Sequence, residues 1–251
     1  MTKLLRAGFA RLFRDKIFWI CSAVMAAFGV YIALDQYIAS KRFDMFNPTA
    51  DEIIFIFLAY GGMVYAIFCA LFVGREYSDG TIRNKFIVGH THASIYVSNL
   101  IVTAVGNIII SLAYILPALV IGIPALGWFQ RPISYIAVTF IALLILAAAY
   151  AAVFTMLSLL NSNKAVNAVV CIALATLLLM AAVTMRDQIY YASGFGKQIL
   201  SILIDLSPAG QSMQLTMFST DKPEILALYS IGLTAALTAI GIVLFKRKDI
   251  K

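Results

Sequence analysis

Charged side chains of both signs gather in one short segment of this 251-residue sequence, residues 74–85, which reads GREYSDGTIRNK. The charges that we single out within it are Glu76, Asp79, Arg83 and Lys85. Gly80 suits a turn, and Thr81 is predicted to cap a short helix that follows it. Such a compact helix–turn unit is either a docking surface for a partner or a solvated loop that only ends the preceding apolar run. The physical chemistry of these residues leaves both interpretations open.

The sequence lacks the common motifs for catalysis and for metal or phosphate binding. It contains no GxxxxGK[ST] loop, no HExxH and no GxSxG. The glycines of segment 74–85 lie beside acidic residues, which would repel a phosphate. His90 and His92 have no Cys, Asp or Glu close enough in sequence to complete a metal site. We therefore predict no catalytic residue, no metal site and no cofactor bound by this chain.

A second polar group is spaced for one face of a helix. Asn99, Thr103 and Asn107 follow one another at intervals of four residues inside an apolar run. Two interpretations are open for them, namely hydrogen bonds between packed helices or a polar stripe along a translocation path.

The elements that position these residues must lie in a membrane. Hydrophobic residues make up 62% of the chain and charged residues 12%, and the mean hydropathy is +0.93. A soluble domain has about 45–50% apolar and 25% charged residues, so a water-soluble globule is excluded. The chain has 19 Lys and Arg against 12 Asp and Glu. The basic residues lie mainly in segments that flank the apolar runs, which indicates that they orient the chain in the membrane rather than bind nucleic acid.

Hydropathy predicts an all-α fold, a single transmembrane domain over residues 1–251 with six spans. The spans are 17–37, 52–74, 95–123, 133–160, 166–185 and 224–245. Residues 1–16 are predicted to form an amphipathic interfacial helix, with its apolar face in lipid and its basic face toward anionic headgroups. Residues 75–94 form the loop between spans two and three, and residues 186–222 an extracellular segment of one or two short interfacial helices. Pro117 and Pro124 predict a kink or an early exit in the third span.

The basic residues also predict an orientation. The termini and the loops after spans two and four carry about 13 Lys and Arg, against about 6 on the other side. Both termini are therefore expected in the cytoplasm. No ionisable side chain lies near the centre of a span, which argues against a proton-coupled carrier.

The loop resembles that of permease subunits of ABC transporters of the type-2 exporter class. Glu76 and the pair Gly80-Thr81 match the recurring E-x-x-x-G-T of that family, and Asn84 matches a frequent polar position. The resemblance implies a coupling helix that sits in a groove of a separate ATP-binding subunit, with Glu76 and Arg83 expected to touch it. The residues assigned to this contact are Arg75, Glu76, Tyr77, Ser78, Asp79, Gly80, Thr81, Ile82, Arg83 and Asn84.

The same resemblance implies the partners and the class of function. Two ATP-binding subunits, which hold ATP and Mg, would dock on two permease chains that form a homodimer or a heterodimer in a bacterial cell membrane. Such permeases are similar to those for bacteriocin or lantibiotic immunity and peptide-antibiotic efflux. We expect export of a hydrophobic or amphipathic peptide or drug, with ion extrusion and lipid-linked glycan export as other cargoes. The alternative is a stand-alone channel, or a scaffold that recruits a soluble partner through residues 75–94.

Overall fold

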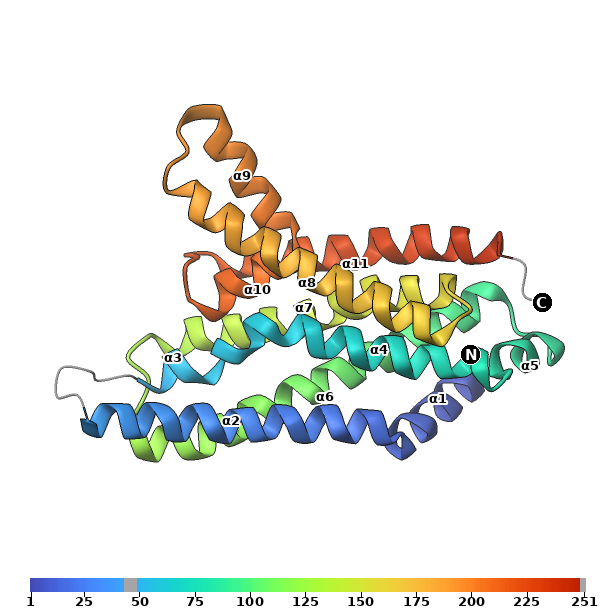
Figure 1. The fold of residues 1–251 in the computed structure, drawn as a ribbon, viewed down its shortest axis with the longest axis horizontal. Coiled ribbons are helices and arrows are strands. Elements are labelled where there is room, and N and C mark those ends of the chain that lie inside the picture. Colours follow the sequence, from blue (N-terminus) through green and yellow to red (C-terminus); the bar gives the residue numbers. More distant parts are fainter. Residues whose placement is uncertain (43–48, 249–251) are drawn as a thin grey trace.

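The computed structural model describes residues 1–42 and 49–248, and within these ranges it is helical and has no strand. Six of its helical segments are long and apolar enough to cross a membrane, as predicted. They lie side by side along the long axis of the molecule (Figure 1). These segments are α2 (Lys16–Arg42), Ala50–Ser78, α6 (His92–Leu126), α7 (Ile133–Leu160), α8 (Lys164–Ile189) and α11 (Pro223–Lys246).

The second of these segments is broken, although its sequence predicts one continuous span. It consists of α3 (Ala50–Ile54), the 3-10 helix η1 (Ile56–Tyr60) and α4 (Gly61–Ser78). Carbonyl groups around the break are bonded by side chains of other helices. The Ser212 hydroxyl donates to the Leu58 carbonyl at 2.8 Å, and the Tyr114 hydroxyl donates to the Ile53 carbonyl at 2.7 Å. These bonds stabilise an irregular backbone that lipid would leave without partners.

The longest helix, α6, packs closely against α2. A Cβ atom at Gly29 of α2 would lie 2.4 Å from the carbonyl oxygen of Tyr114 in α6, so the two backbones approach as only glycine permits. Pro117 and Pro124 both lie inside α6 and do not end it, because the helix continues to Leu126. The expected kink or early exit from the membrane stays a prediction. At 1.5 Å per residue α6 is about 50 Å long, so it tilts within or extends beyond a hydrocarbon core of about 30 Å.

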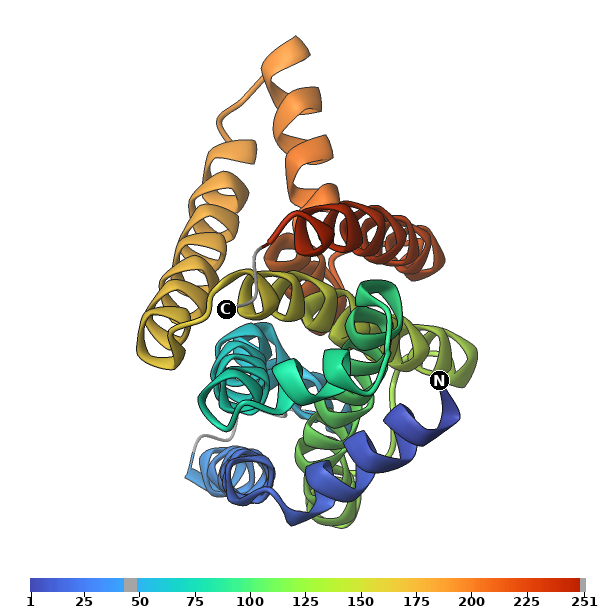
Figure 2. The ribbon, with the colours of Figure 1, turned by 90° about the vertical axis from the view of Figure 1, so that its right-hand side faces the viewer.

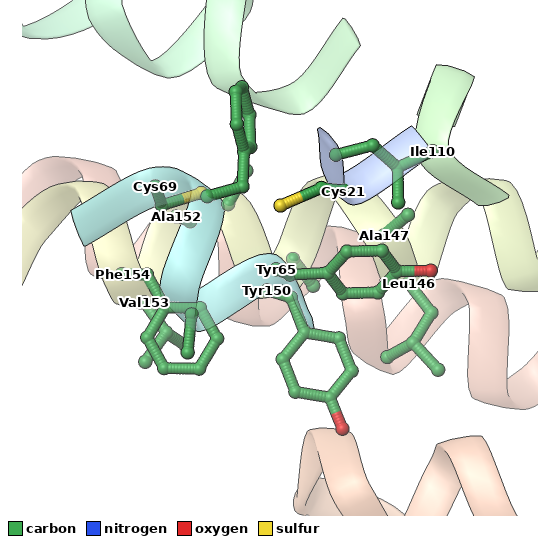
Figure 3. Close-up of a cluster of buried hydrophobic side chains, with 14 of the residues drawn as sticks. Cys21, Tyr65, Cys69, Ile110, Leu146, Ala147, Tyr150, Ala152, Val153 and Phe154 are labelled. Carbon is green, nitrogen blue, oxygen red and sulfur yellow. The ribbon is translucent and has the colours of Figure 1, made fainter. Parts of the chain in front are cut away.

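The core lies between α4, α6 and α7 (Figure 3). Tyr65 of α4 and Tyr150 of α7 are buried, and their ring centroids are 5.6 Å apart. Small residues of α7 are buried beside them, including Ala147, Ala151 and Ala152. The small side chains let the neighbouring helices come close.

The segment after α8 forms two short helices, α9 (Gly194–Leu206) and α10 (Pro208–Thr216). The outer part of α8 and α9 project from one side of the bundle, whereas α10 returns to it (Figure 1). Gln211 of α10 is fully buried and accepts a 2.5 Å hydrogen bond from the hydroxyl of Ser230 in α11. Much of α10 is therefore covered by protein, and the interfacial placement of residues 186–222 stays an expectation.

The first helix, α1 (Thr2–Arg14), crosses the end of the bundle that also holds the short helix α5 (Thr81–Ile87) and both termini (Figures 1 and 2). Its apolar face does not lie in lipid as expected. Leu4 and Leu12 are buried in the protein, and Leu5 and Phe9 pack against the same core. The helix is amphipathic as predicted, but its apolar face packs against α6 and not against the bilayer.

Candidate functional site at the α4–α5 turn

The charged segment of the sequence folds as a helix–turn–helix unit. α4 ends at Ser78, and Gly80 adopts the left-handed conformation, with φ 64° and ψ 9°, before α5 begins at Thr81. Gly80 is itself the residue at the N-cap position of α5, so the prediction that Thr81 caps this helix is wrong. The left-handed backbone explains why a glycine stands at this position.

Glu76 lies at the centre of a buried polar cluster just before the turn. Its Oε1 atom is 2.5 Å from Arg11 Nη1 of α1 and 2.5 Å from Lys85 Nζ of α5. Its Oε2 atom accepts a 2.9 Å hydrogen bond from Asn99 Nδ2 of α6. The Arg11 guanidinium also lies over the Phe72 ring, 4.0 Å from its centroid. One carboxylate thus joins α1, α4, α5 and α6.

The Glu76 side chain is only 2% exposed, so its charge is neutralised within the chain and is not presented on the surface. Burial also lowers the pKa of Lys85, and the neighbouring Glu76 carboxylate opposes that shift by favouring the charged amine. The expected contact between Glu76 and a partner is not supported by this arrangement, in which Glu76 positions the helices around the turn.

A second ion pair joins α1 to α4 one residue earlier. Arg75 Nη1 is 2.6 Å from Asp15 Oδ2, and the Asp15 side chain is 1% exposed. The other carboxylate oxygen of Asp15 accepts a 2.7 Å hydrogen bond from the backbone amide of Ile17. Asp15 therefore stabilises the start of α2 and holds Arg75 at the same time.

The carboxyl-terminal end of the described chain reaches the same region. The Tyr77 hydroxyl donates to the carbonyl of Leu159 at the end of α7. Lys248 Nζ donates to Leu159 O and to Tyr77 Oη, both at 2.9 Å. Burial lowers the pKa of Lys248 to about 8. Hydrogen bonds thus join the end of α4, the end of α7 and Lys248, which lies two residues beyond α11.

The face of α5 that points away from the bundle makes no ion pair within the described chain and points to solvent. Ile82 is 1% exposed and Phe86 packs against His92 and Phe245, so these two side chains attach α5 to the bundle. Ile87 and Val88 are 73% and 75% exposed, which is unusual for apolar residues outside the spans. The exposed residues of the unit, which we call the outer face of the turn, are Ser78, Asp79, Arg83, Asn84, Ile87 and Val88.

The polar group of α6 is buried and hydrogen-bonded between helices. Asn99 bonds to Glu76, the Thr103 hydroxyl is 2.7 Å from the Thr155 hydroxyl of α7, and Asn107 Nδ2 donates to the Ala147 carbonyl at 3.0 Å. All three side chains have protein partners, as the first of the two interpretations requires. A role on a translocation path stays a prediction.

Sequence reasoning missed several residues that shape this site. Arg11 lies in the helix predicted over residues 1–16, and no local pattern pairs it with Glu76, which is 65 positions away. Lys248 is distant from Tyr77 in the same way. Ile87 and Val88 stand between Phe86 and Gly89 in the sequence, and no local pattern indicates that they are exposed.

The chain matches one protein family over more than half of its length. A family model described as "ABC-2 family transporter protein" matches residues 4–182, which include α1, the α4–α5 turn, α6 and α7. No curated protein matches the sequence at a significant level. Permeases of this family are transmembrane transport subunits that generally work with an ABC ATP-binding partner. The α4–α5 turn and the six membrane-crossing segments are therefore those of a multi-pass permease, and the chain belongs to the ABC-2 family of transporter proteins.

Proposed function

We propose that this chain is the transmembrane subunit of an ATP-driven exporter, and that a separate ATP-binding subunit docks on the outer face of the turn. The observation that carries the proposal is this exposed face, which combines Arg83 and Asn84 with the apolar pair Ile87 and Val88. An apolar centre with a polar rim is the composition of a protein interface. A loop that only ended a span would have no reason to expose two large aliphatic side chains.

The buried side of the turn connects the proposed docking face to the membrane-spanning helices. Glu76 and Lys85 tie α5 to α4, and Asn99 ties the same cluster to α6. Packed helices joined in this way move as nearly rigid bodies. In the proposed mechanism, closure of the nucleotide-binding subunits displaces α5, and α4 and α6 follow, which narrows the cytoplasmic entrance of the transport path.

The proposed assembly holds two permease chains, identical or different, and two ATP-binding subunits that carry ATP and Mg. Both termini and the turn face the cytoplasm of a bacterial cell, in keeping with the excess of Lys and Arg at that end of the bundle. The cargo is a hydrophobic or amphipathic peptide or drug. The support for this cargo is the lack of acidic or basic side chains near the span centres, which leaves no charged site for an ion.

The proposal is tested with the permease and an ABC ATP-binding subunit that co-purifies with it. We expect Arg83→Glu and Ile87→Asp to weaken association of the purified subunits by about tenfold or more each, since central interface residues contribute at this level. Tyr191→Asp is the matched control, because Tyr191 is 91% exposed and lies between α8 and α9, away from the turn. Unchanged association and ATPase activity in both turn variants would contradict the proposal.

A further inference from the structure

Two ion pairs of opposite polarity fix α1 to the end of α4. Arg11 of α1 and Asp15, the residue directly after α1, bind Glu76 and Arg75, which are adjacent on α4. On each side of the contact one residue is acidic and one is basic, so a shift of α1 along α4 breaks both pairs and brings like charges together. The Glu76 and Asp15 side chains are 2% and 1% exposed, and a buried carboxylate without a partner is costly. α1 and the start of the turn therefore move together.

The face of α1 that points away from the protein is strongly basic. Asp15 is the sole acidic residue in positions 1–34 and its charge is paired with Arg75. The exposed cations around α1 are Lys3, Arg6, Arg14 and Lys16. Each such residue near a membrane surface raises the affinity for anionic lipid by about fivefold.

Two aromatic side chains mark the level of the membrane surface beside these cations. Phe13 and Trp19 are 51% and 55% exposed, although both are large and apolar. The Trp19 indole donates a 2.9 Å hydrogen bond to the Phe13 carbonyl, which holds the two residues together at the junction of α1 and α2. Exposed aromatic residues next to Lys and Arg at the start of a span are typical of the headgroup region.

We propose that the basic outer face of α1 binds anionic phospholipid headgroups, and that this binding stabilises the α4–α5 turn through the Arg11–Glu76 and Asp15–Arg75 pairs. The lipid composition of the adjacent leaflet then sets how firmly the turn is held. The inference concerns the permease alone and does not require an ATP-binding subunit, so its test is independent of the proposed function.

The test uses the full chain in nanodiscs of phosphatidylcholine, with and without phosphatidylglycerol. We expect phosphatidylglycerol to slow amide hydrogen exchange over residues 78–89, which span the turn and α5. Arg14→Gln is expected to lower the phosphatidylglycerol retained by the purified protein by about fivefold. The combined Lys3→Gln, Arg6→Gln, Arg14→Gln and Lys16→Gln variant is expected to lose the lipid effect on exchange. Lys197→Gln with Lys222→Gln is the control, because both lysines are exposed and lie outside α1 and the turn.

A further variant separates lipid binding from its transmission to the turn. Asp15→Asn with Arg75→Gln removes the second ion pair, while Asn retains the oxygen that accepts from the Ile17 amide. This variant is expected to retain phosphatidylglycerol as the wild type does, yet to lose much of the effect of the lipid on exchange at the turn. If the pair had a purely structural role, the variant would change amide exchange at the turn by the same amount in both lipid mixtures. That result would overturn the proposal that the pair transmits lipid binding to the turn.

One other result would overturn the inference, namely identical exchange over residues 78–89 of the wild type with and without phosphatidylglycerol.

Discussion

Glu76 has one of the highest densities of polar contacts among the described residues, with Arg11, Lys85 and Asn99 all bound to its two oxygens. Its position explains why a glutamate is suited to the first place of the E-x-x-x-G-T pattern. A carboxylate has two oxygens and accepts several hydrogen bonds, so it can join a guanidinium, an amine and an amide at once. Residues of α1, α5 and α6 are brought together by this single group.

Replacing Glu76 by Gln is predicted to destabilise the permease by about 3 kcal/mol, because it leaves two neighbouring cations without their shared negative charge. Thermal unfolding in detergent measures this change. Asp79→Asn is the control, since Asp79 is exposed three residues later and is predicted to leave the melting temperature almost unchanged. Equal melting temperatures of Glu76→Gln and the wild type would show that the cluster does not stabilise the fold.

The residue scale is also where the sequence was least informative. The sequence singles out the acidic and basic residues of segment 74–85, but which of them are buried depends on Arg11 and Asn99 in other helices. Ion pairs between distant positions leave no periodic pattern in a single sequence. For the same reason the sequence did not distinguish Glu76, which lies inside, from Asp79 and Arg83, which lie outside.

At the scale of the element, the turn depends on the backbone of Gly80. Its φ of 64° is costly for residues with a Cβ, and no atom lies within 4 Å of the position that a Cβ would take. Gly80→Val is therefore predicted to destabilise the turn by about 1–2 kcal/mol through the backbone alone. Amide exchange over residues 80–88 measures the loss.

Two variants isolate this backbone effect. Gly80→Asn should be nearly neutral, because Asn tolerates the left-handed conformation. Gly196→Val adds the same side chain at a glycine of α9 that also has open space around it but no positive φ, and it should not destabilise the protein. If Gly80→Asn were as damaging as Gly80→Val, a contact of Gly80 and not its backbone would be the cause.

Hydropathy predicts where the long helices lie along the sequence, but it does not predict what packs against each of them. The apolar runs predicted six spans, and the structure has six helical segments fit to cross a membrane. Amphipathicity likewise predicted a helix over residues 1–16, but an apolar face reads the same whether lipid or α6 covers it. Hydropathy does not predict the break at Ile56–Tyr60, because the residues of the break are themselves apolar, and it is stabilised by Ser212 of a distant helix.

At the scale of the whole molecule, one end of the bundle gathers the parts that a partner would have to move. α1 and the α4–α5 turn lie together at that end (Figure 2). Ion pairs and hydrogen bonds connect α1 with the turn, and the turn with the end of α7 and Lys248. α8 and α9 diverge at the other end and expose many apolar side chains to lipid or to a second chain. This asymmetry agrees with the proposal that an ATP-binding subunit acts on that end of the bundle.

Site-specific photo-cross-linking tests this account most directly. One variant carries a photoreactive residue at Ile87, on the outer face of the turn, and the other carries it at Tyr191, at the opposite end. Both are expressed in cells together with the ATP-binding subunit that co-purifies with the permease. We predict a cross-link between position 87 and that subunit, identified by its GxxxxGK[ST] peptide, and none from position 191, although Tyr191 is the more exposed of the two. A subunit that co-purifies with the permease but cross-links from position 191 and not from position 87 would contradict the account.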